Sequence, residues 1–124
     1  MAENYWPAVV EKADTSLRYR VKPIPAAAVD EYFSRGKRVS RKGITLYHQP
    51  KPALEVGFLI KRKAGNAVCR NRTRRLFWGT IHNLDLGFIP DRGYLFLFHN
   101  AFTATGPLYE AINGLIAQAN QSRQ

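Results

Sequence analysis

The feature that most constrains this chain is a basic stretch of fifteen residues, Lys61 to Arg75, which reads KRKAGNAVCRNRTRR. Seven of these residues are Lys or Arg, and none is acidic. Like charges at this density repel one another, so a folded domain tolerates the stretch only where water or a polyanion neutralises it. The stretch must therefore lie at the surface of whatever fold the rest of the chain builds.

A helix is predicted to begin near Ala67, directly after a Gly65-Asn66 turn. Asn66 is a suitable N-cap, because its side-chain oxygen can accept a hydrogen bond from a free backbone N–H group. At 100° per residue, one arc of this helix carries Cys69, Thr73, Leu76, Phe77, Thr80 and Leu84. The remaining arc carries Arg70, Asn71, Arg72, Arg74 and Arg75. The pattern predicts a helix that buries one stripe and presents arginines outward, with phosphate-binding N–H groups at its start.

A solvated basic helix face that binds nothing is the plain alternative to a ligand-binding one. Arginine outnumbers lysine in the stretch. Guanidinium groups form planar, bidentate hydrogen bonds with phosphate, whereas an ammonium group acts as a point charge. The composition of the stretch therefore favours a phosphate-bearing partner.

The remaining composition narrows the class of protein. The chain has 124 residues, a hydrophobic fraction of 45%, a formal net charge of +10 and a pI of about 10.2. These values predict one folded domain that binds a polyanion. No run approaches the ~20 apolar residues of a membrane span, no signal-peptide pattern opens the sequence, and Cys69 is the single cysteine. We expect a cytoplasmic, monomeric protein that binds neither membranes nor DNA.

Local patterns predict the other elements. Pro25 suits the first helical position of a helix over residues 26–35, which Gly36 would end as the C′ glycine. Residues 44–48 and 54–60 are expected to form a hairpin whose tip is Gln49-Pro50-Lys51-Pro52. A buried strand covers residues 94–98, and a last helix opens at Thr105. Residues 1–18 are expected to be a partly ordered extension, 19–120 a single domain, and 121–124 a polar tail.

No catalytic or metal site is apparent among these elements. The nine acidic residues are scattered, and His48, His82 and His99 lack the spacing of metal ligands. A magnesium-dependent nuclease needs clustered carboxylates. We therefore expect no catalysis by the protein alone.

Two segments carry a resemblance to a known family. The run GNAVCRNRTRR, Gly65 to Arg75, resembles the R-N-R signature of the bacterial ribonuclease P protein subunit, and FSRGKRVS, Phe33 to Ser40, resembles the segment that closes its first helix. The resemblance covers roughly residues 19 to 118. It implies an α+β fold: a two-layer α/β sandwich similar to domain 2 of ribosomal protein S5. About four strands and three helices are expected, in the order α-β-β-β-α-β-α.

The resemblance also implies the function and its sites. Ribonuclease P removes the 5′ leader of precursor tRNA, and its catalytic subunit is an RNA that binds most of the required Mg²⁺. The residues that would bind the catalytic RNA are Lys61, Arg62, Lys63, Asn66, Arg70, Asn71, Arg72, Arg74 and Arg75. The residues that would line the cleft for the 5′ leader are Phe33, Tyr47, Arg35, Lys37 and Arg38. The alternative function is a general RNA-binding or ribosome-associated protein without a role in tRNA processing.

The chain departs from the family pattern at several positions. Val29 stands where the family has a first-helix aromatic, and Lys61 stands where the family has Ser. Trp78-Gly79 replaces the common Arg-Glu, and His99-Asn100 occupies the place of a strand-ending Arg. These departures concern the leader cleft and the far end of the basic helix, and they leave the R-N-R run intact.

Overall fold

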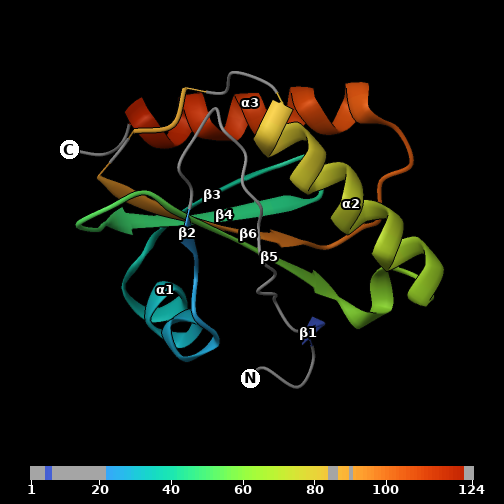
Figure 1. Cartoon of the computed structure of the whole chain (residues 1–124), viewed down its shortest axis with the longest axis horizontal. Helices are drawn as coiled ribbons and strands as arrows, with labels where there is room; N and C mark the ends of the chain where they lie inside the picture. The colour runs from blue at the N-terminus through green and yellow to red at the C-terminus, as the bar shows by residue number, and fades with distance from the viewer. Residues whose placement is uncertain (1–4, 7–21, 84–86, 90, 122–124) are drawn as a thin grey trace.

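A computed structural model describes residues 5–6, 22–83, 87–89 and 91–121 (Figure 1). The α-helices of this part of the chain are α1 (Val29–Arg35), α2 (Ala67–Asn83) and α3 (Thr105–Gln121). The strands are β1 (Tyr5–Trp6), β2 (Lys22–Pro23), β3 (Lys37–Arg41), β4 (Ile44–Pro50), β5 (Glu55–Lys61) and β6 (Arg92–Phe98). Short 3₁₀ turns precede α1 and α2, at Ala26–Ala28 and Arg62–Ala64. From α1 onward the order is the predicted α-β-β-β-α-β-α.

The strands form one sheet in the order β1-β5-β6-β4-β3, with β2 also paired to β5. The sheet is mixed, because β5 and β6 are parallel and α2 connects them, whereas β6, β4 and β3 are antiparallel neighbours. Figure 1 shows α2 and α3 on one face of the sheet and α1 on the other. The α+β class is confirmed. The sheet has six strands where about four were expected, since β1 and β2 each add two residues to the edge at β5.

The predicted hairpin between residues 44 and 60 is wrong. β4 and β5 are not neighbours, because β6 lies between them and pairs with both. The hairpin instead joins β3 to β4 through Lys42 and Gly43, whose φ angles are 51° and 84°. Two consecutive residues with positive φ are the signature of the tight turn that matches the twist of paired strands. The proline-rich segment after Gln49 is therefore a crossover rather than a hairpin tip, and β4 continues to Pro50.

Two hydrophobic clusters hold the helices to the sheet. The larger lies under α2 and α3, and α3 contributes the whole predicted stripe of Leu108, Ala111, Ile112, Leu115, Ile116 and Ala119. The smaller lies under α1 and contains Ile24, Val29, Tyr32, Leu59, Leu95 and Leu97. Because both faces are covered, β4 is buried at Thr45 as well as at Ile44 and Leu46.

A polar network fixes α1 against the sheet. The Tyr32 hydroxyl donates to Glu55 Oε2 at 2.6 Å, and Lys51 Nζ lies 3.5 Å from Glu31 and 4.0 Å from Glu55. Burial, reinforced by the hydrogen bond to Glu55, raises the pKa of the Tyr32 hydroxyl above its usual range. Gly93 leaves the space that this hydroxyl occupies, since a Cβ there would collide with it.

Gly36 ends α1 in a way that the sequence did not predict. Its φ of −72° and ψ of 152° are extended, so it is not the left-handed C′ glycine that was expected. A Cβ at Gly36 would lie 2.6 Å from the carbonyl oxygen of Tyr32. Close packing, rather than a positive φ, is therefore the reason for glycine at this position.

Candidate nucleic-acid interface

The N-terminus of α2 is built as predicted. Asn66 Oδ1 accepts a hydrogen bond from the backbone N–H of Cys69 at 2.9 Å, and the helix begins at Ala67. Capping with an amide oxygen leaves the other N–H groups of the first turn directed outward. Asn66, expected to bind RNA, therefore serves first as the helix cap, although its side chain is exposed.

The orientation of α2 is set by its buried side. Phe77 packs on Phe58 and Phe96, and Thr73 is fully buried. The Thr73 hydroxyl donates to the carbonyl of Cys69 at 3.0 Å and accepts from the N–H of Phe102 at 2.9 Å, tying α2 to the segment before α3. Ile81, which the predicted stripe omitted, is also buried, whereas Leu84 lies outside the described residues.

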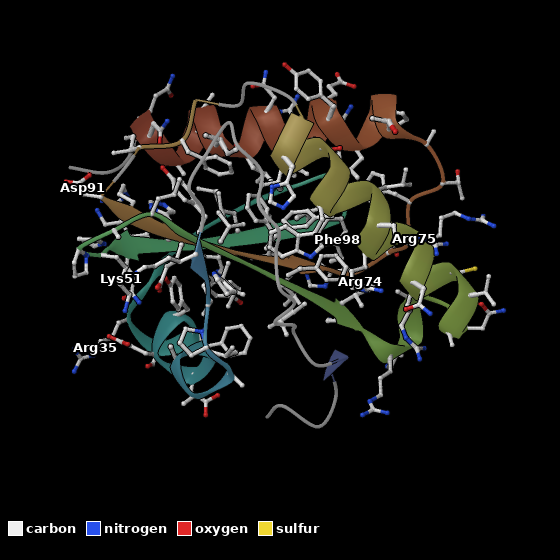
Figure 2. The ribbon with its side chains drawn as sticks, in the orientation of Figure 1. Arg35, Lys51, Arg74, Arg75, Asp91 and Phe98 are labelled. Carbon is white, nitrogen blue, oxygen red and sulfur yellow. The ribbon has the colours of Figure 1, made fainter. Side chains whose placement is uncertain are left out.

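The arginines of α2 are not equivalent. Arg72 and Arg75 are exposed, and Asn71 and Arg74 are half-buried. Arg74 and Arg75 are consecutive residues of α2 and are labelled in Figure 2. Two exposed guanidinium groups beside a basic loop form a surface suited to phosphates.

Arg70 lies on the predicted outward arc but makes contacts that were not predicted. Its Nη1 donates to the carbonyl of Gly65 at 2.7 Å and lies 3.4 Å from the carbonyl of Arg62. Arg70 thus closes the 62–65 loop onto α2 and is not simply an outward RNA contact. The helical period placed it on the outward arc correctly, but period alone does not reveal that the preceding loop folds back under it.

This loop and the outward side of α2 form one basic surface, which we call the α2 surface. Its residues are Lys61, Arg62, Lys63, Asn66, Arg70, Asn71, Arg72, Arg74 and Arg75. Arg62 and Lys63 are exposed, and Lys61, at the end of β5, is half-buried. Gly65 allows the loop to approach the helix, because a Cβ at this position would lie 3.1 Å from Cβ of Cys69. The basic side chains of the 62–65 loop therefore lie beside those of the first turns of α2.

The two aromatic residues predicted for the leader cleft lie together on the α1 side of the sheet. The rings of Phe33 and Tyr47 make an edge-on contact, with centroids 5.0 Å apart, and both are only partly buried. Arg38 is the register partner of Tyr47 on β3, so their side chains share this face of the sheet. Arg35, the last residue of α1, is exposed (Figure 2).

Lys37 does not belong to this group. Its register partner is His48, which in turn pairs with Tyr94 of the core under α3. Successive residues of a strand point to opposite faces, so Lys37 and Arg38 cannot both line a cleft beside Tyr47. The strand register therefore places Lys37 on the α3 side of the sheet, on the face opposite to Tyr47 and Arg38.

Three polar side chains, Ser40, Thr45 and His99, also lie on the α1 side of the sheet, and this group was not predicted from the sequence. The Ser40 and Thr45 hydroxyls lie 3.1 Å apart, and Thr45 Oγ1 is 2.8 Å from Nε2 of His99. Burial, and secondarily the charge of Lys61, lowers the pKa of His99. Recognising the β3–β4 hairpin would have paired Ser40 with Thr45, but nothing local brings His99, 54 residues from Thr45, beside them.

Among the described residues, no group of three or more His, Cys, Asp or Glu side chains is arranged to hold a metal ion. Within the same part of the chain, no helix combines the length and apolarity needed to cross a membrane.

Fold and surface together define a small, basic α+β protein whose second helix presents arginine to solvent. The family model of ribonuclease P matches residues 27–105, which include α1, α2 and the strands β3 to β6. The chain therefore belongs to the ribonuclease P family, as its bacterial protein subunit.

Individual relatives agree with this assignment. The ribonuclease P protein component of Shouchella clausii is 34% identical over 71 residues, which cover 55% of this chain and 58% of the relative. That of Listeria monocytogenes is 28% identical over 83 residues, or 64% of this chain and 68% of the relative. The match thus spans little more than half of the first relative.

Solved structures share the fold. An RNase P protein mutant from Staphylococcus aureus, described as defective in mRNA degradation activity, superposes with a TM-score of 0.68 at 18% identity, over 79% of this chain and 87% of that one. The RNase P protein from Thermotoga maritima gives 0.65 at 14% identity, over 73% and 89%.

Proposed function

We propose that this protein binds the catalytic RNA of ribonuclease P and the 5′ leader of precursor tRNA, and so supports magnesium-dependent maturation of the tRNA 5′ end. The observation that carries the proposal is the division of the surface. Exposed guanidinium groups lie on α2, and a separate pair of partly buried aromatic rings lies across the sheet, on the α1 side.

The α2 surface suits a folded RNA. Arg72 and Arg75 are exposed on α2, which Thr73 and Phe77 anchor from its buried side. Arg62 and Lys63 are exposed on the loop that Arg70 ties to the helix. Phosphate contacts of this kind set position and affinity without reading sequence. A catalytic RNA of fixed shape is recognised well by such a surface, because its phosphates are held in a fixed arrangement.

The α1 side suits a single strand. Phe33 and Tyr47 offer ring surface for stacking, and Arg38, in register with Tyr47, supplies charge beside them. Stacking of one base on an aromatic side chain contributes about 1–3 kcal/mol and tolerates any base. A leader of varying sequence needs this kind of tolerance.

Chemistry is assigned to the RNA. The protein would hold and orient the catalytic RNA and the precursor tRNA. Mg²⁺ would be bound mainly by RNA phosphates, because hard cations prefer oxygen ligands. The protein is then catalytic only as part of the ribonucleoprotein.

Reconstitution tests the proposal. Purified protein that is free of RNA is expected to leave precursor tRNA intact, whereas adding cognate catalytic RNA and Mg²⁺ is expected to give faster cleavage at the 5′ junction than RNA alone. Cleavage at that junction by the protein alone would contradict it, as would no effect of the protein on the RNA. Sequencing the RNA that copurifies separates the alternative, because a ribosome-associated protein would enrich ribosomal RNA.

A further inference from the structure

Arg92, the first residue of β6, is a buried cation with an incomplete set of partners. It is 7% exposed, and its Nη2 lies 2.8 Å from Nδ1 of His48, which is fully buried. Arg92 Nε and His48 Nε2 are both buried and have no hydrogen-bond partner. Among the described residues, no carboxylate forms an ion pair with Arg92.

This arrangement leaves hydrogen-bond donors without acceptors. A guanidinium stays charged in proteins, and burying it normally requires an anionic partner. Because Arg92 can only donate, the hydrogen bond occupies the lone pair of His48 Nδ1, and the proton of a neutral His48 must then be on Nε2. Arg92 Nε–H and His48 Nε2–H therefore both lack an acceptor, and an oxyanion is the simplest group that provides several.

Lys37 adds a third positively chargeable side chain beside Arg92 and His48. It is the register partner of His48 on β3, so Arg92, His48 and Lys37 lie across three neighbouring strands on the α3 side. Burial, and then the charges of Arg92 and Lys37, lowers the pKa of His48 to about 4. Lys37 is exposed, so the row reaches solvent at the β3 edge. Figure 2 marks this end of the sheet by Asp91, the residue before Arg92.

We propose that Arg92, His48 and Lys37 form a phosphate-binding site on the α3 side of the sheet. The planar guanidinium presents paired donors that match two oxygens of a phosphate group, and Lys37 supplies a further positive charge. The site is separate from the leader cleft, because Tyr47 faces the opposite side of the sheet. The phosphate belongs either to an RNA backbone or to a free anion, and the two sources share this chemistry.

The imidazole of His48 reports on occupancy. Nitrogen-15 NMR of the full-length protein would follow its titration in chloride and in inorganic phosphate at equal ionic strength. A bound phosphate accepts from the imidazole and offsets the positive field, so we expect the pKa of His48 to rise by about one unit, saturably. The shift should be lost in Arg92→Met and reduced in Lys37→Met, and retained in the control Lys42→Met, whose amine instead pairs with Glu110 at 3.4 Å.

A second arm identifies the source of the phosphate. If a short single-stranded RNA moves the His48 signal and inorganic phosphate competes with it, the occupant is an RNA backbone. If only inorganic phosphate acts, the occupant is a free anion. The proposal is overturned if neither ligand shifts His48, or if the shift persists in Lys37→Met and Arg92→Met alike. Should Arg92→Met not fold, Lys37→Met decides alone, because Lys37 is exposed.

Discussion

Arg72 and Arg70 are two residues apart on α2, yet the structure predicts different consequences of removing each. Arg72 is exposed, and nothing in the described part of the chain is hydrogen-bonded to its guanidinium. Arg72→Ala should therefore change the free energy of unfolding by no more than about 0.5 kcal/mol. Arg70→Ala removes the donor to the carbonyl of Gly65 and should destabilise the protein by about 1–3 kcal/mol, since hydrogen bonds from charged groups are strong.

The effect of Arg72→Ala on RNA affinity follows from counterion release. One phosphate contact contributes about 0.7–0.9 to the slope of log affinity against log salt. Relative to about 1 M salt, losing that contact weakens binding by about sixfold near 0.1 M and by less than about twofold near 0.5 M. Arg72→Lys should keep the slope, because the charge remains.

The assay combines fluorescence anisotropy with labelled catalytic RNA over a salt series and thermal unfolding of the same variants. Two outcomes would refute the argument. One is an unchanged salt slope in Arg72→Ala, which would show that Arg72 meets no phosphate. The other is a loss of stability in Arg72→Ala equal to that in Arg70→Ala, which would assign both residues to the fold.

Three further predictions test other parts of the structure. Tyr47→Ala should weaken binding of precursor tRNA by about 1–3 kcal/mol and spare mature tRNA, whereas Tyr47→Phe should bind normally; a loss independent of leader length would remove the cleft assignment. Since the pKa of His48 is lowered to about 4, the unfolded chain binds a proton that the folded protein excludes. Stability measured by urea unfolding should thus fall by about 3 kcal/mol as pH drops from about 6.5 to 4, and His48→Gln should lack this component. Gly93→Ala should destabilise by about 1–3 kcal/mol by displacing the Tyr32 hydroxyl; Tyr32→Phe, which removes that hydroxyl, should make the two changes less than additive in a double-mutant cycle, and strict additivity would contradict the contact.

The helices were predictable because their signals are local. Asn66 caps α2 through a backbone group three residues away, and the stripe of α3 repeats at the period of the helix itself. The outward position of Arg72 and Arg75 follows from the same period. These features depend on interactions within one or two turns, so the sequence alone determines them.

The faces of the sheet depend on pairing between distant strands, and here prediction from sequence failed. β6 lies between β4 and β5 and pairs with both, and no local pattern in the sequence indicates which strands will be neighbours. Once β3 is paired with β4, the period of two sends Arg38 to the side of Tyr47 and Lys37 to the side of His48.

Side-chain contacts between distant segments could not be predicted from the sequence either. Arg70 lies on the predicted outward arc but closes a loop, and Arg92 meets His48 across 44 residues of sequence. The sequence by itself determined that this protein would carry a helix with arginines on its outward side. Only the tertiary structure decided which of those arginines remain exposed and which residues share a face with the aromatic pair, because both depend on contacts between segments that the chain brings together only when folded.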